Sequence, residues 1–259
     1  MRRPAYTNDI SKKNGLAKAL RTIVKWILIA ALALSVGLCA WFALRGYGLY
    51  AQAAEAKSVD EMAEGIREQA HFVELENLPQ TYLDAVVSVE DHRFYRHPGF
   101  DILATGRALI NDLKAGAIVE GGSTITQQLA KNEFFTQEQV VERKIAEVFM
   151  AFDIESRLDK EEILELYVNS IYFGDGHYGI ADACQGYLGK APEAMNDWES
   201  VLLAGVPNAP SVYAPTQNFD LARQRQQQVL GRMVKYGALT QAQADEIAAQ
   251  TPYALTSTA

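Results

Sequence analysis

Apolar residues recur three or four positions apart along most of this chain, which is the spacing of one helix face. Alternation with a period of two, typical of strands, is scarce. The pattern therefore predicts a mainly α fold. The expected helices cover residues 80–90, 138–158, 160–169, 198–205, 219–236 and 241–250, with one more after Asp101, one from Ser123 and a short one ending at Gly189.

Polar and glycine residues mark several of these helix ends. Asp101 is placed as an N-cap, and Asp159 with Glu162 resembles a capping box. Thr240 is a further expected cap, and Gly237 a stop signal. Residues 111–119 lack such a pattern, so we expect a mobile connection there.

One segment is apolar throughout. Residues 26–44 read WILIAALALSVGLCAWFAL and contain no charged residue. At ~1.5 Å per residue, about 20 helical residues cross a hydrocarbon core of roughly 30 Å. Trp26 and Trp41 lie near the two ends, where indole rings prefer the membrane interface. We therefore expect a transmembrane anchor.

Basic residues precede this segment. Seven Lys and Arg residues stand against one acid, Asp9, in the first 25 positions. The positive-inside rule then places the N-terminus in the cytoplasm and the chain from Ala51 onward outside the cell membrane. Ala51-Gln52-Ala53 also resembles a signal-peptide cleavage site. Signal h-regions are only about 7–15 residues long, however, so the longer span favours an uncleaved anchor.

Composition supports one folded domain behind this anchor. The 259 residues are 49% hydrophobic and carry a net charge of −8. No basic stripe follows the N-terminal cluster, so we expect no nucleic-acid partner. Cys39 and Cys184 lie in different parts of the chain, so we expect no disulfide. The expected division is a basic tail (1–25), the anchor (26–44), a helical connector (45–74) and the main domain (75–259).

Glu90 continues the apolar face of the helix that Pro79 opens. Leu83, Val86 and Val87 recur at i, i+3 and i+4, and Glu90 follows three residues later. A carboxylate held against apolar surface loses hydration, which raises its pKa toward the range of a general base near neutral pH. A helix-end glutamate that points into water is the plainer alternative.

A glycine-rich turn leads into the helix from Ser123. Residues 121–128 read GGSTITQQ, with Ser123 as the expected N-cap. The free N–H groups and positive dipole end of such a helix suit an anion such as phosphate. Thr124, Gln128 and Lys131 follow on a polar stripe at i, i+4 and i+7. An ordinary capped helix with a solvated face would show the same pattern.

Arg143, Lys144 and Glu147 stand off the expected apolar face of the helix 138–158. That face consists of Val141, Ile145, Val148 and Phe152. Arg143 and Glu147 are four residues apart, so the plain interpretation is a surface ion pair worth only about 0.3–0.5 kcal/mol.

Taken in this order, the segments resemble the peptidoglycan glycosyltransferase family, the transglycosylase module of bifunctional penicillin-binding proteins. Glu90-Asp91 with Phe94, His97 and Gly99 is similar to the family's first motif, and GGSTITQQ matches the second. Arg143-Lys144 with Glu147 resembles the third. Residues 160–169 (KEEILELYVN) and 179–189 (GIADACQGYLG) resemble the fourth and fifth, with Val168 and Leu188 where the family more often has Leu and Phe. The resemblance covers about residues 75–215.

The resemblance implies a lysozyme-like helical catalytic domain that lies on the membrane. It implies polymerisation of lipid II, a disaccharide-pentapeptide on undecaprenyl pyrophosphate, into glycan strands. We hypothesise that Glu90 is the general base that deprotonates the acceptor 4-hydroxyl, with inversion at the anomeric carbon. Glu147 corresponds to the family's second acidic residue, which orients cationic side chains or a divalent cation, Mg or Mn. No organic cofactor is expected.

The same resemblance assigns substrate-binding residues. We expect the pyrophosphates to be held by Lys131, Arg143 and Lys144. We expect the cleft to be lined by Ser123, Thr124, Gln127 and Gln128. Supporting positions are Asp91, His97 and Arg107. Expected partners are lipid II, the growing glycan chain, the membrane and other cell-wall synthesis or division proteins.

Several alternatives stand beside this interpretation. The chain contains no K-T-G and no suitably placed Ser-x-x-Lys, so we expect no transpeptidase activity. A lysozyme-like enzyme that cleaves glycan would need a protonated acid and has little use for a basic set. An inactive membrane-anchored scaffold is disfavoured because Glu90 and Glu147 are both present. A metal site on His92 and His97 is a third alternative, although two histidines in a turn more often pack or hydrogen-bond.

Overall fold

The computed structural model describes residues 7–115, 121–136 and 140–250. Helices dominate it, which confirms the predicted mainly α fold. The helices are α1 (Thr7–Ala56), α2 (Val59–Arg67), α3 (Gln80–Glu90), α4 (Ile102–Ala115), α5 (Ile125–Phe134), α6 (Val141–Arg157), α7 (Lys160–Ser170), α8 (Gly179–Leu188), α9 (Asp197–Gly205), α10 (Pro210–Tyr213), α11 (Phe219–Tyr236) and α12 (Gln241–Ala249). Short 3₁₀ helices are η1 (Leu75–Asn77), η2 (Phe94–Arg96), η3 (Pro192–Ala194) and η4 (Val206–Asn208), and the strands are β1 (Tyr172–Gly174) and β2 (His177–Tyr178).

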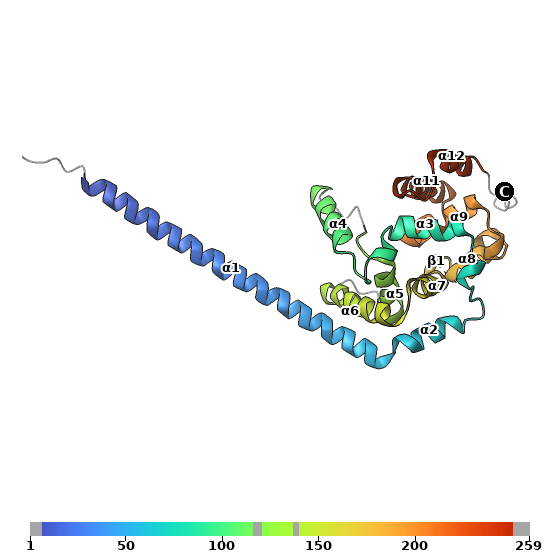
Figure 1. The fold of residues 1–259 in the computed structure, drawn as a ribbon, viewed down its shortest axis with the longest axis horizontal. Coiled ribbons are helices and arrows are strands. Elements are labelled where there is room, and N and C mark those ends of the chain that lie inside the picture. The colour runs from blue at the N-terminus through green and yellow to red at the C-terminus, as the bar shows by residue number, and fades with distance from the viewer. Residues whose placement is uncertain (1–6, 116–120, 137–139, 251–259) are drawn as a thin grey trace, which may run out of the picture.

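Helix α1 extends far from the rest of the molecule (Figure 1). Between Ala19 and Ala56 it is long and apolar enough to cross a membrane, and large side chains such as Leu32 and Leu34 are exposed. No proline separates the predicted span 26–44 from Ala56, so nothing in the backbone ends the helix there. The predicted anchor is therefore part of a longer helix.

The C-terminal part of α1 packs on α6. Gly46 is buried at this crossing, and a Cβ atom there would lie 2.5 Å from Ile145 Cγ2. The two backbones thus approach as closely as glycine permits. The rings of Tyr47 and Tyr50 contact Phe149, with centroids 5.4 and 5.9 Å away. The end of the anchor helix is thereby fixed to the main domain.

Helix α2 belongs to the core. Ser58 starts it with a capping box, in which the Ser58 side chain accepts from Glu61 N–H and the Glu61 side chain accepts from Ser58 N–H. Val59, Met62 and Ile66 are buried in the hydrophobic core. Part of the segment predicted as a connector (45–74) therefore packs inside the main domain.

The core lies between α3, α5, α7, α9 and α11. Tyr82, Tyr167 and Trp198 are among its largest fully buried side chains. Helix α9 packs against both α3 and α11, and α5 packs against α6 and α7 (Figure 1). This arrangement brings the end of α3, the body of α5 and one face of α11 to a common cleft.

Helix α6 buries a different face from the predicted one. Of the expected apolar set (Val141, Ile145, Val148, Phe152), Val141 is 57% exposed and Phe152 43%. The buried side chains are Ala146, Glu147, Met150, Ala151 and Ile154. Because α1 covers Ile145 and Phe149, α6 contacts two partners at once, and a one-faced pattern does not describe it. Residues 138 and 139 of the predicted helix lie outside the described residues.

Helix ends with local capping signals fall close to their predicted positions. Asp159 and Thr240 cap α7 and α12, and Gly237, with φ at +83°, ends α11. Asp101 caps α4, accepting from Ala104 N–H at 2.8 Å. Of the predicted mobile connection 111–119, the residues up to Ala115 continue α4 and the rest lie outside the described residues.

The sequence pattern does not predict the antiparallel hairpin of β1 and β2. Its register pairs Tyr172 with Tyr178 and Gly174 with His177. Gly179 ends the hairpin with φ at +78°, and a Cβ there would lie 2.4 Å from the carbonyl oxygen of Asn169. Strands of two and three residues are too short to show alternation, so only the glycines marked this segment.

Candidate active site

Glu90 is the last residue of α3. Tyr82, Leu83 and Val86 bury the helix in the core, which leaves the Glu90 side chain only 9% exposed at its end. Gln128 Nε2 donates a hydrogen bond to Glu90 Oε2 at 2.8 Å. Burial raises the pKa of Glu90, and the Gln128 hydrogen bond partly opposes this. The predicted desolvated carboxylate is confirmed, and the alternative of a glutamate in water is wrong.

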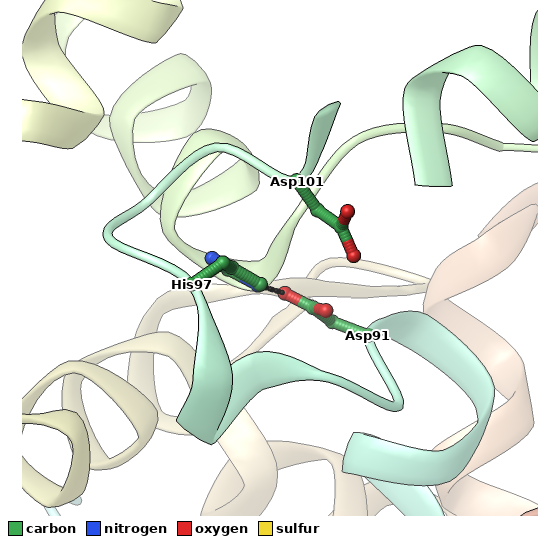
Figure 2. A group of neighbouring side chains, drawn as sticks. All are labelled: Asp91, His97 and Asp101. Carbon is green, nitrogen blue, oxygen red and sulfur yellow. Dashed lines mark hydrogen bonds and ion pairs between the residues drawn. The ribbon is translucent and has the colours of Figure 1, made fainter. Parts of the chain in front are cut away.

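Asp91 joins the end of α3 to two other segments. Its Oδ2 lies 2.8 Å from His97 Nε2, as the dashed line in Figure 2 marks, and accepts from Ile125 N–H at 3.2 Å. Ile125 is the first residue of α5. Asp91 thus fixes the position of α5, which carries Gln128 and Lys131, relative to Glu90.

Asp91, His97 and Asp101 are all buried and offer ligand atoms within 4.8 Å of one another (Figure 2). Protein donors already engage these carboxylates. Arg93 pairs with both oxygens of Asp101, with Nε at 2.7 Å from Oδ2. The cluster therefore forms a hydrogen-bonded network that stabilises the turn.

His92 and His97 contact different partners. The ring of His92 stacks on Tyr236, with centroids 3.8 Å apart, whereas His97 pairs with Asp91. The two histidines pack and hydrogen-bond, which is the plainer role that the sequence suggested.

The cap of α5 lies one residue later than predicted. Thr124 Oγ1 accepts from Gln127 N–H at 3.1 Å, and Gln127 Oε1 accepts from Thr124 N–H at 3.2 Å. A capping box needs Glu or Gln three residues after the cap, which Thr124 has and Ser123 lacks. Thr124 Oγ1 also donates to Gly99 O at 2.6 Å. Gln127 is 1% exposed inside this box, so its side chain is structural here.

Helix α6 places two cations on Glu147. Lys144 Nζ donates to Glu147 Oε2 at 2.7 Å and to Ser123 Oγ at 2.6 Å, and Arg143 Nε lies 3.0 Å from Glu147 Oε1. Glu147 is fully buried, so the predicted surface ion pair is wrong: this pair is shielded from water. Burial lowers the pKa of Lys131, and the charge of Glu147 opposes that effect. Glu147 therefore holds together a cationic group of Lys131, Arg143 and Lys144.

A cleft of about 450 Å³ brings many of the predicted residues together. The predicted residues that line it are Glu90, Asp91, Arg107, Ser123, Thr124, Gln128 and Lys131. The lining does not include His97, Gln127, Arg143, Lys144 or Glu147, but Lys144 contacts it through Ser123. Glu90 and Lys131 thus share one groove.

Another wall of the cleft comes from residues that the sequence reasoning missed. Tyr213 of α10 belongs to it, as do Arg225, Gln228, Arg232 and Tyr236 of α11. The α11 residues recur at i, i+3, i+7 and i+11, so they share one helix face. That polar stripe was the available signal, but a solvated helix face looks the same in the sequence.

Known proteins resemble this chain over most of its length. The family model described as Transglycosylase matches residues 56–234. Penicillin-binding protein 1A of Aquifex aeolicus (strain VF5) is 45% identical over 175 residues, which is 68% of this chain and 24% of that protein. Penicillin-binding protein 1F of Bacillus subtilis (strain 168) is 41% identical over 181 residues, 70% of this chain and 25% of that protein. The chain spans about a quarter of the length of these curated relatives.

Among solved structures, a crystal structure of penicillin-binding protein 1A from Haemophilus influenzae is 22% identical with a TM-score of 0.42, covering 70% of this chain and 17% of that one. The family-model match includes Glu90, the glycine-rich turn and the cations on α6, and it extends over more than half of the sequence. The chain therefore belongs to the transglycosylase family.

Proposed function

We propose that this chain is a peptidoglycan glycosyltransferase that polymerises lipid II into glycan strands. The observation that carries the proposal is the cleft in which buried Glu90 and cationic Lys131 face the same space. Lipid II joins a sugar to a diphosphate, so its polymerisation needs a proton acceptor for one partner and positive charge for the other.

Glu90 serves as the general base. It takes the proton of the acceptor 4-hydroxyl while that oxygen forms a bond to C1 of the growing chain. The bond between C1 and the diphosphate oxygen breaks on the opposite face, which inverts the anomeric centre. Gln128 engages Oε2, and Oε1 has no hydrogen-bond partner among the described residues.

The undecaprenyl diphosphate leaves with the electrons of the broken bond and needs charge neutralisation more than protonation. Lys131 supplies charge within the cleft, and Lys144 supplies it at the edge beside Ser123. Glu147 keeps Lys144 and Arg143 in place through both of its oxygens. Because these cations already engage Glu147, a divalent Mg or Mn ion would come with the diphosphate, and no organic cofactor is needed.

We further propose that α1 anchors the domain in the cell membrane, with the N-terminus in the cytoplasm and the cleft outside. The apolar helix and the basic residues before it support this orientation. A lipid-linked substrate would then lie in the same bilayer as the anchor.

The test is polymerisation of lipid II by the full chain in detergent. We expect glycan polymer from the native chain and at least about 100-fold less from Glu90→Gln, since a general base contributes that much or more. Glu64→Gln, an exposed position on α2, is the matched control and should be fully active. Polymer at the native rate from Glu90→Gln would remove the base assignment. Soluble muropeptides released from purified sacculi would instead support the glycan-cleaving alternative.

A further inference from the structure

Arg225 lies beside Glu90, although it belongs to none of the five sequence motifs. Its Nη2 is 4.0 Å from Glu90 Oε1, and the two side chains are 13% and 9% exposed. We propose that Arg225 is a positioning residue that holds the Glu90 carboxylate ionised and in place for proton abstraction. This inference rests on the proposed function of Glu90 as a base.

Arg225 is itself fixed by neighbours on three elements. Its Nε donates to the carbonyl oxygen of Gly205 on α9 at 3.3 Å, and its Nη1 donates to Gln228 Oε1 on α11 at 3.1 Å. The guanidinium carbon lies 5.8 Å from the ring centroid of Tyr213 on α10. A guanidinium restrained in this way is pre-organised, so it can hold a carboxylate without losing further side-chain freedom.

The stem of Arg225 packs closely against Gly205 of α9. A Cβ atom at Gly205 would lie 2.9 Å from Arg225 Cγ. Any larger residue at Gly205 would displace the arginine stem and with it the guanidinium. Gly205 and Arg225 therefore form a matched pair that connects α9 and α11 to the catalytic carboxylate.

The charges around Glu90 show why such a cation matters. Burial raises the pKa of Glu90, and Asp91 raises it further. Gln128 and Lys131 of α5, together with Arg225 of α11, lower it. The other titratable or charged groups near the carboxylate or along the cleft are Tyr82 on α3, His92 after it, Arg107 on α4, Tyr167 on α7, Tyr213 on α10, and Arg232 and Tyr236 on α11. Without Arg225, the effect of burial would raise the pKa of Glu90 further, and more of the base would be protonated at neutral pH.

The direct test measures Glu90 without substrate. The full chain, labelled with ¹³C at glutamate carboxyl carbons, is titrated by NMR, and Glu90→Gln assigns the signal. We expect Arg225→Gln to raise the pKa of Glu90 by about one unit or more, as expected for two charges ~4 Å apart. Arg225→Lys should raise it less, and Arg223→Gln, an exposed neighbour on α11, should leave it unchanged. An unshifted Glu90 signal in folded Arg225→Gln overturns the proposal.

Kinetics then separate positioning from other roles. In Arg225→Gln, the acidic limb of the kcat profile should move to higher pH, and activity should recover there with KM unchanged. A uniform loss of kcat at every pH, or a raised KM with an unmoved limb, overturns the proposal in favour of a structural or substrate-binding role. Gly205→Ala retains Arg225 but displaces it, so it should move the limb in the same direction and covers the case in which Arg225→Gln does not fold. If the native chain makes no polymer, the proposed function fails, while the NMR result still decides the role of Arg225.

Discussion

At the scale of single residues, the buried carboxylate of Glu90 lowers the stability of the fold that holds it. Glu90 is nearly buried and its pKa is raised, so its ionised form is disfavoured in the folded state relative to the unfolded chain. When the pKa of a carboxyl group is higher in the folded chain than in the unfolded chain, the protonated group favours the folded state. This contribution is fully present below the pKa of the unfolded chain and is lost as the pH rises through the pKa of the folded chain. At neutral pH the ionised form of Glu90, which the proposed base role requires, is therefore present at the expense of stability.

We expect Glu90→Gln to be more stable than the native chain at pH 7. Glutamine retains the shape and a hydrogen bond to Gln128 but carries no charge into the buried site. The gain should shrink toward zero near about pH 3.5, where the native carboxyl is already protonated. Urea unfolding at the two pH values measures the difference, with Glu64→Gln as the exposed control. A Glu90→Gln variant that is less stable at pH 7 would contradict the desolvation argument.

Glu147, unlike Glu90, stabilises the fold in its ionised form, because two cations pair with its carboxylate. Arg143 and Lys144 contact both of its oxygens, and the carboxylate is fully buried. Glu147→Ala should destabilise the fold by about 3 kcal/mol, the low end for a broken buried pair because Lys144 is half exposed and can rehydrate. Chemical denaturation measures this, and Glu64→Ala should change stability by no more than about 0.5 kcal/mol. If Glu147→Ala and Glu64→Ala changed stability equally, the fold would not depend on the pairing of Glu147 with the cationic group.

At the scale of elements, local chemistry explains which parts of the fold are readable from the sequence. Asp159, Gly237 and Thr240 act within one turn of their own helices, and the predicted ends of α7, α11 and α12 agree with the structure to within a residue. The sequence pattern predicts the cap of α5 at Ser123, one residue early, whereas the capping box with Gln127 selects Thr124. Ends set by neighbouring side chains are therefore predictable when the whole capping box is considered.

Tertiary contacts limit how much of the candidate site can be predicted from the sequence. Glu90, Gln128 and Lys131 were expected together because they lie in recognisable motifs, and they do share the cleft. Arg225 meets Glu90 because α11 packs directly on α3 while α9 packs on both, and no local pattern reports that packing. Burial of Glu147 was missed for the same reason: an i, i+4 pair has the same spacing on a solvated helix and on a buried one.

The crossing of α1 and α6 provides a test at this scale. Alanine in place of a helical glycine normally stabilises by about 0.5–1 kcal/mol. Gly48→Ala should show this gain, since nothing lies within 4 Å of its new methyl group. Gly46→Ala would meet Ile145, and overpacking of this kind costs about 1–3 kcal/mol. Thermal unfolding in detergent should therefore give opposite signs for the two variants, with Ile145→Ala restoring stability to Gly46→Ala. Equal gains would show that the helices are not in close contact.

At the scale of the whole molecule, α1 and α4 each expose several large apolar side chains. Helix α1 presents its membrane-length segment, and α4 presents Ile102, Leu103 and Ile110, which are 72%, 65% and 53% exposed. In Figure 1, α1 extends away from the domain on the side where α4 lies. Exposed apolar patches of this kind mark contact surfaces. A domain that rests on the bilayer would bury α4 in the same membrane that α1 crosses.

A chain that begins at residue 45 separates the two contacts. It lacks the apolar span but retains the part of α1 that packs on α6, so we expect it to fold and still bind lipid vesicles through α4. Replacing Ile102 and Leu103 with serine should weaken binding at least about tenfold, because burial of one such side chain is worth about 1.5–3 kcal/mol. Val212→Ser, at an exposed apolar position on α10, should bind as before. Co-sedimentation with vesicles gives the affinities, and circular dichroism checks each fold. If the truncated chain stays in solution, or the serine variant binds undiminished, α4 is not the second membrane contact, and α1 alone would hold the domain at the membrane.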